Sequence, residues 1–119
     1  MLNIFIVDDA LVIRKNLSKI FTDLGHTVVG EAQNGNEALE KCKTIEKIDL
    51  ITMDITMPGM DGIETTQRMR EIKPNTPIVM VTSHGQEEYV AKALKAGAMS
   101  FILKPITEEK LAKVVSDFV

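Results

Sequence analysis

Short apolar runs in this chain end abruptly in charged or hydroxyl side chains, and this pattern restricts the fold more than any other feature. The polar residues that follow the runs are Asp8 and Asp9, Asp54, Thr82 and Ser83, and Lys104. If the runs are parallel strands of one sheet, these groups meet at its carboxyl edge, where open α/β sheets bind ligands. Carboxylates, a lysine and a hydroxyl in one crevice predict a site for a hard cation and a phosphoryl group.

Segments of helical periodicity separate the apolar runs. We expect strands over 2–7, 26–30, 50–53, 78–81 and 100–103. Helices are expected to carry the apolar positions of 13–24, 38–45, 63–72, 90–94 and 111–118, because these recur every three or four residues. Thr107 followed by two glutamates is a helix-start signal. Five repeats of strand and helix predict an α/β fold, a doubly wound parallel five-stranded sheet with helices on both faces.

The strand order follows from the site. Asp8 and Asp9 come after the strand over 2–7, and Asp54 comes after the strand over 50–53. These two strands must be neighbours for the three carboxylates to meet. They are neighbours in the flavodoxin-like strand order 2-1-3-4-5. We therefore predict a (βα)5 sheet of that order.

Composition restricts the class of protein. The chain has 119 residues, of which 45% are hydrophobic, so we expect one core and a single domain over 1–119 without an effector domain. A net charge of -3 argues against nucleic acid as the main partner. Cys42 cannot form an internal disulfide, and no apolar stretch approaches the roughly 20 residues of a membrane helix. We expect a cytoplasmic protein that binds no membrane, with Cys42 buried.

Each candidate site residue is weak evidence by itself. An acidic pair after a strand is usually a surface turn, and a threonine in a strand is usually only packing. Their joint position is what indicates a site, because three carboxylates repel one another and Mg²⁺ or Mn²⁺ relieves that repulsion. Lys104 would add a mobile positive charge, and the sequence leaves the Lys104-Pro105 bond open between cis and trans. His84 is expected to be an exposed loop residue.

Taken together, these motifs resemble the response regulator receiver domains, and in particular the single-domain chemotaxis type. The resemblance covers essentially the whole chain. The motifs that carry it are Val7-Asp8-Asp9, the segment 53–62 (MDITMPGMDG), Thr82-Ser83 and Lys104-Pro105. Any one of them is weak, whereas all of them in this order and spacing are specific.

The resemblance implies a function for each motif. Asp54 would accept a phosphoryl group from a histidine kinase, which would form an aspartyl phosphate. Asp8, Asp9, Asp54 and the backbone carbonyl of Thr56 would surround Mg²⁺. Thr82 and Lys104 would bind the phosphoryl oxygens. The protein would not be an enzyme in the ordinary sense, since it would catalyse only its own phosphorylation and dephosphorylation.

The resemblance also implies a switch. Phosphorylation adds roughly two negative charges at one point. The hydroxyl of Thr82 would move to the phosphoryl group, and Phe101 would rotate into the vacated space, although an aromatic residue in a strand is by itself core packing. The helix around 90–94, the strand over 100–103 and the last helix would form the output surface. Its lysines are Lys92, Lys95, Lys110 and Lys113.

The partners implied are a histidine kinase, a downstream protein such as a flagellar motor switch protein, and a phosphatase, with the protein itself monomeric. A phosphorelay intermediate or a receiver excised from a transcription regulator stays open. A Mg²⁺-dependent phosphohydrolase with an aspartyl-phosphate intermediate is less suited, because such enzymes space their two aspartates by two positions and Asp8 and Asp9 are adjacent. A flavin-binding domain would need a loop rich in Ser, Thr and Gly after 2–7, where 9–12 reads Asp-Ala-Leu-Val.

Overall fold

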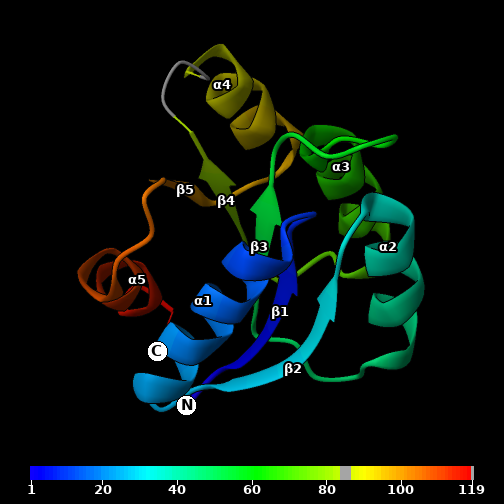
Figure 1. The fold of residues 1–119 in the computed structure, drawn as a ribbon. Helices are drawn as coiled ribbons and strands as arrows, with labels where there is room; N and C mark the ends of the chain where they lie inside the picture. Colours follow the sequence, from blue (N-terminus) through cyan, green and yellow to red (C-terminus); the bar gives the residue numbers. More distant parts are fainter. Residues whose placement is uncertain (84–86, 119) are drawn as a thin grey trace.

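A computed structural model of the chain describes residues 1–83 and 87–118, in which strands and helices alternate (Figure 1). The strands are β1 (Asn3–Val7), β2 (Thr27–Ala32), β3 (Leu50–Asp54), β4 (Ile78–Thr82) and β5 (Ser100–Leu103). The helices are α1 (Leu11–Asp23), α2 (Gly35–Thr44), α3 (Gly62–Ile72), α4 (Glu87–Ala96) and α5 (Glu108–Val115). His84 lies outside the described residues. No helix in the described part of the chain is long and apolar enough to cross a membrane.

The strands form one parallel sheet in the order β2-β1-β3-β4-β5. The predicted fold class and strand order are therefore confirmed. In the central pair, Val7 of β1 lies opposite Met53 of β3. Because the two strands are parallel and in this register, Asp8 and Asp54 follow at the same edge of the sheet.

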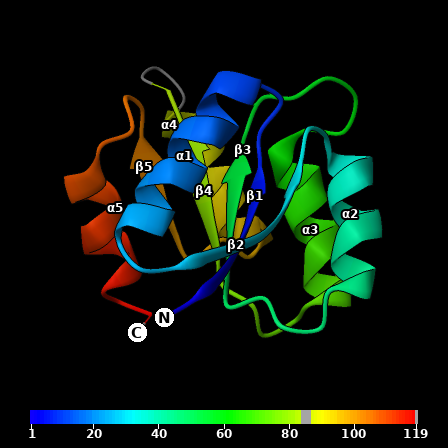
Figure 2. The ribbon, with the colours of Figure 1, turned by 60° about the horizontal axis from the view of Figure 1, so that its bottom comes forward.

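Helices cover both faces of the sheet, and each face has its own core, whereas the sequence predicted one (Figures 1 and 2). Helices α2, α3 and α4 pack on one face, where Phe5 and Val7 of β1 point. Helices α1 and α5 lie together on the other face, against Ile4 and Ile6. Because successive strand residues point to opposite faces and both are covered, the central strands read as continuous apolar runs. Cys42 is fully buried in the first core, as predicted.

Strand β2 extends beyond the range predicted for it. The sequence predicted a strand over 26–30, but the pairing continues until Ala32 lies opposite Val7 of β1. Glu31 lies within this extension, and its carboxylate forms an ion pair with Arg14 of α1 at 3.1 Å. A charged residue often marks the end of a strand, but here the backbone of Glu31 pairs with Ile6 of β1 and its carboxylate is neutralised by Arg14.

The helix starts lie at the same sheet edge as the polar strand ends, because every connection returns the chain to a parallel strand. Side-chain oxygens of Asn34, Asp61 and Thr107 each accept a backbone N–H bond and begin α2, α3 and α5. Thr107 was predicted in this role. Helix α1 differs, because its N-cap residue is Ala10, whose methyl side chain accepts no hydrogen bond.

Candidate functional site

The structure brings three carboxylates together at the carboxyl ends of β1 and β3. Asp8, Asp9 and Asp54 each offer an oxygen atom, and these atoms all lie within 4.8 Å of one another. Asp8 and Asp54 are buried, with 1% and 6% of their surfaces exposed, whereas Asp9 is exposed. A buried group of like charges is unfavourable unless positive charge compensates it.

Lys104 provides part of that compensation. Its Nζ lies 3.7 Å from Asp8 Oδ2 and 3.7 Å from Asp54 Oδ1, so it forms ion pairs that are longer than hydrogen bonds. The backbone N–H of Lys104 donates to the carbonyl of Thr82 at 2.7 Å, which ties the end of β5 to the end of β4. The peptide bond between Lys104 and Pro105 is cis.

One lysine does not neutralise the cluster. Burial, followed by the charge of Asp8, raises the pKa of the Asp54 carboxyl to about 7, against the opposing effect of Lys104. Burial also raises the pKa of Asp8, although the N–H of Ala10 donates to its Oδ1 at 2.9 Å. The other oxygen of Asp8, Oδ2, is buried and accepts no hydrogen bond from the described residues. Excess negative charge, an all-oxygen donor set and an unsatisfied acceptor together fit a hard divalent cation.

The remaining predicted residues lie on the strand ends and loops around this cluster. Thr82 is buried at the end of β4, and Thr56 is exposed two residues beyond Asp54 in the loop that follows β3. Phe101 of β5 lies opposite Met80 and is 42% exposed. Because Met80 and Thr82 are two positions apart on β4, Phe101 and Thr82 are on the same face of the sheet.

The first residue of α3, Gly62, allows this helix to approach the backbone of Asp54 closely. A Cβ atom on Gly62 would overlap the carbonyl oxygen of Asp54. The N–H of Gly62 also donates to the carbonyl of Ile55 at 2.7 Å. The start of α3 therefore packs directly on the backbone that carries the Asp54 side chain. Segment 53–62 entered the sequence interpretation as one of the receiver motifs, but the close packing of Gly62 on Asp54 was not predicted.

Two basic residues contact the backbone of the site loops, and sequence analysis missed both contacts. Lys110, predicted only as part of a charged surface, donates from Nζ to the carbonyls of Leu103 and Pro105 at 2.9 and 3.0 Å, on either side of Lys104. Arg14 donates from Nη1 to the carbonyl of Asp8 at 2.7 Å. Neither contact has a signal in the sequence, because a basic residue on a helix is usually solvated.

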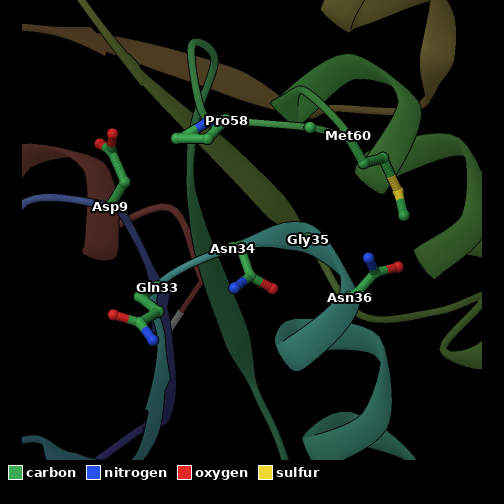
Figure 3. A pocket seen from close by; sticks show the side chains of 8 residues that line it. Asp9, Gln33, Asn34, Gly35, Asn36, Pro58 and Met60 are labelled. Atoms are coloured by element: carbon green, nitrogen blue, oxygen red, sulfur yellow. The ribbon is translucent and has the colours of Figure 1, made fainter.

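A polar cavity of about 550 Å³ opens beside the cluster (Figure 3). Asp9, Gln33 and Asn34 line it together with Pro58, so it lies between the loop that begins α2 and the loop that follows β3. Its lining includes the carboxylate of Asp9 and the side-chain amides of Gln33 and Asn34. It therefore offers a path by which an ion reaches the exposed carboxylate of the cluster.

Residues 4–116 match the family described as the response regulator receiver domain. Among curated proteins, the chain is 43% identical over 113 residues to the chemotaxis protein CheY of Thermotoga maritima, covering 95% of this chain and 93% of the relative. It is 41% identical over 113 residues to the CheY of Bacillus subtilis, again covering 95% and 93%.

A solved structure shows the same similarity. It is the complex of CheX, CheY, BeF3 and Mg²⁺ from Borrelia burgdorferi. The similarity has a TM-score of 0.92 at 39% sequence identity, and it covers 99% of this chain and 90% of the matched chain. The likeness therefore extends through nearly the whole of both folds, including the strand ends that carry the cluster.

Proposed function

Because the chain belongs to the response regulator receiver domain family, we propose that Asp54 is the residue that accepts the phosphoryl group. Family membership makes the chain a phosphorylatable signalling domain and decides against the phosphohydrolase and flavodoxin alternatives. The observation that supports Asp54 is its position. It is the last residue of β3, lies within the carboxylate cluster and has its Oδ1 3.7 Å from Lys104 Nζ.

The cation is Mg²⁺, held by Asp8, Asp9, Asp54 and the backbone carbonyl of Thr56, and Mn²⁺ has the same ligand preference. The buried Oδ2 of Asp8, which accepts no hydrogen bond from the described residues, and the short distances within the cluster support this ligand set. The Borrelia burgdorferi CheY in the solved complex is accompanied by Mg²⁺ and BeF3, which is consistent with it. When bound, the ion supplies positive charge where the transferred phosphoryl group is most negative.

In the transfer, a carboxylate oxygen of Asp54 attacks the phosphorus of a phosphohistidine on the kinase. An O–P bond forms, the P–N bond breaks, and the electron pair of that bond leaves with the histidine nitrogen. Such a transfer needs alignment and charge neutralisation more than a general base. Lys104 supplies the second of these, since its ammonium lies between two carboxylates and can turn to a phosphoryl oxygen. Loss of the phosphoryl group to water then resets the domain.

The phosphoryl group is read through Thr82 and Phe101. Thr82 is buried at the end of the strand beside β3, and Phe101 occupies the same face of the sheet one strand further out. Movement of the Thr82 hydroxyl toward the phosphoryl group makes room for the ring of Phe101, which is now 42% exposed. The change at Asp54 thus reaches the surface through two adjacent strands.

The output surface is formed by α4, β5 and α5. Exposed apolar side chains support this assignment, since Tyr89, Leu94 and Phe101 are 39%, 44% and 42% exposed. A cavity of about 380 Å³ between β5 and α5 is lined by Phe101, Lys110 and Lys113 among others. These features suit a protein partner with an apolar segment and acidic flanks.

The cellular role is in chemotaxis, with a histidine kinase as donor, a flagellar motor switch protein as target and a phosphatase to end the signal. The curated CheY relatives support this role. Residues 1–119 act as one monomeric receiver domain in the cytoplasm.

The proposal is tested by incubating the protein with acetyl phosphate and Mg²⁺ and measuring its intact mass after rapid quenching. One phosphoryl group is expected on the wild type and none on Asp54→Asn. Partner capture from lysate with and without beryllofluoride then tests the output, and a motor switch protein enriched only with beryllofluoride is expected. Label that persists in Asp54→Asn contradicts the assignment of the acceptor.

A further inference from the structure

The loop between β1 and α1 joins two aspartates of the cluster, and hydrogen bonds hold its backbone. The N–H of Asp8 donates to the carbonyl of Ala32 at 3.1 Å, and the N–H of Ala10 donates to Asp8 Oδ1 at 2.9 Å. A side chain provides a further bond, since Arg14 Nη1 donates to the carbonyl of Asp8 at 2.7 Å. That carbonyl belongs to the peptide group between Asp8 and Asp9. The orientation of this peptide group determines how the two carboxylates are placed relative to each other.

Arg14 is itself held in place. Its Nε donates to Glu31 Oε1 at 3.1 Å, and the Arg14 side chain is only 12% exposed. Glu31 belongs to β2, and its own carbonyl accepts a bond from Lys41 Nζ at 2.7 Å. The planar guanidinium group donates in two fixed directions at once, which a lysine ammonium on a flexible stem does not reproduce. Arg14 therefore connects the site loop to a rigid strand of the sheet.

The start of α1 offers the loop little other support. Its N-cap residue, Ala10, provides no side-chain acceptor, and Leu11 and Val12 are 54% and 77% exposed. The first turn is therefore weakly packed against the rest of the protein, and the anchored guanidinium group of Arg14 compensates for this.

We infer that Arg14 is a positioning residue for the cation site, which orients the Asp8–Asp9 peptide so that both carboxylates face Asp54. This inference rests on the proposed function, since it concerns the same Mg²⁺ ligands. Arg14 acts through the carbonyl of Asp8 and is not a ligand. Residues that orient metal ligands through hydrogen bonds, without contacting the metal, typically contribute 10–100-fold to metal affinity.

The positioning role and a purely electrostatic role predict opposite results. Arg14 carries a positive charge close to a cation site, and like charges repel. If charge were its main effect, removing the charge would strengthen Mg²⁺ binding. If it positions the two aspartates, removing the guanidinium group weakens Mg²⁺ binding despite the more favourable charge.

Calorimetric titration of the full chain with MgCl2 distinguishes these roles. The proteins are wild type, Arg14→Gln, Arg14→Lys and the control Lys15→Gln. Lys15 is exposed on the same helix, so its substitution changes the net charge as Arg14→Gln does. We expect the affinity for Mg²⁺ to fall about tenfold in both Arg14 variants and to change less than about twofold in Lys15→Gln.

Phosphorylation by acetyl phosphate at varied Mg²⁺ concentration gives a second measurement. The half-saturating Mg²⁺ concentration of Arg14→Gln should rise about tenfold, with a maximum rate close to that of wild type. A general folding defect would instead lower the maximum rate, because it reduces the folded fraction. Thermal melting without Mg²⁺ measures that fraction directly.

Affinity in Arg14→Gln equal to or tighter than wild type overturns the inference and leaves the role of Asp54 untouched. Absence of Mg²⁺ binding by wild type overturns the proposed metal site itself. If Arg14→Gln does not fold, Arg14→Lys decides by the same criterion, because it retains the charge. Failure of both variants to fold makes Arg14 a residue of the fold and overturns the positioning role.

Discussion

The carboxyl edge of β1 and β3 and the outer face of β5 depart from ordinary folding preferences in opposite ways. At the edge, Asp8 and Asp54 are nearly completely buried although both are acids that repel each other. At the outer face, Phe101 of β5 is apolar and yet 42% exposed, as is Leu94 of the preceding helix α4 at 44%. Buried like charges and exposed apolar side chains are each unfavourable for an isolated domain.

The buried acids suit the edge to binding a cation, and the exposed apolar side chains suit the outer face of β5 to binding a protein. A bound cation would relieve the excess negative charge at the edge and so stabilise the folded protein. Docking of a protein at the proposed output surface would cover the apolar surface on β5. The two regions are connected through the pairing of β4 with β5, which brings Thr82 and Phe101 to one face of the sheet. This shared face is the route by which, in the proposed switch, phosphorylation at one region changes the exposed surface at the other.

The largest effect is expected from Asp9→Ala, which removes the exposed carboxylate of the three-carboxylate cluster at the edge. Mg²⁺ binding and phosphorylation by acetyl phosphate should both be lost. Without Mg²⁺, the variant should melt at a slightly higher temperature than wild type, because Asp9 contributes to the raised pKa of Asp54. Mass spectrometry and thermal melting measure the two effects. Glu40→Gln on α2 is the control for the change in charge, and normal phosphorylation of Asp9→Ala contradicts the ligand assignment.

Thr82→Ala should uncouple the carboxylate cluster from the outer face of β5 without changing the residues of either region. The variant keeps Asp54, Lys104 and the metal ligands, so it should still accept one phosphoryl group. The response of α4 and β5 to beryllofluoride should be lost, because the variant lacks the hydroxyl that moves in the proposed switch. Amide hydrogen exchange over these elements provides the measurement, with wild type as reference. A full response in Thr82→Ala shows that the coupling follows another route.

The charge at the edge should also make stability depend on pH. The pKa of Asp54 is raised from 3.8 to about 7, so the folded state holds its proton more tightly than the unfolded state does. The stabilisation of the folded state by protonated Asp54 is complete below about pH 4 and is lost as the pH rises through 7. Without Mg²⁺, the free energy of unfolding should fall by on the order of a few kcal/mol between these values. Denaturant titration at several pH values measures this. In Asp54→Asn the decrease should be much smaller, and an equal decrease assigns it to other groups.

The smallest effect is expected at the outer face. Phe101→Ala should lower the free energy of unfolding by about 1 kcal/mol, well below the roughly 3–5 kcal/mol expected for a fully buried ring such as that of Phe5. Binding of the phosphorylated protein to its partner should nevertheless be lost. Thermal melting of Phe101→Ala and Phe5→Ala sharpens the comparison. Equal destabilisation by the two substitutions would falsify the description of Phe101 as a surface residue.

Local patterns were enough to predict most of the fold. Apolar runs broken by helical periodicity specified the alternation of elements, and the requirement that Asp8 and Asp54 share one site predicted the observed strand order. The range of β2 was the clearest error, since the strand continues to Ala32. The backbone pairing of Glu31 and Ala32 with β1 extends the strand, and the carboxylate of Glu31 is paired with Arg14, 17 residues away. Periodicity within a window cannot detect a partner at that distance.

The sequence by itself determined which chemical groups reach the carboxyl edge, because the end of a strand is a local property and parallel strands end at the same edge. Only the tertiary structure decided how those groups are held. The guanidinium group of Arg14 on the Asp8 carbonyl, the packing of Gly62 behind Asp54 and the cis bond before Pro105 depend on it. The physical reason is that these features arise from contacts and backbone conformations set by the packed elements, whereas residue type alone leaves several alternatives of similar energy.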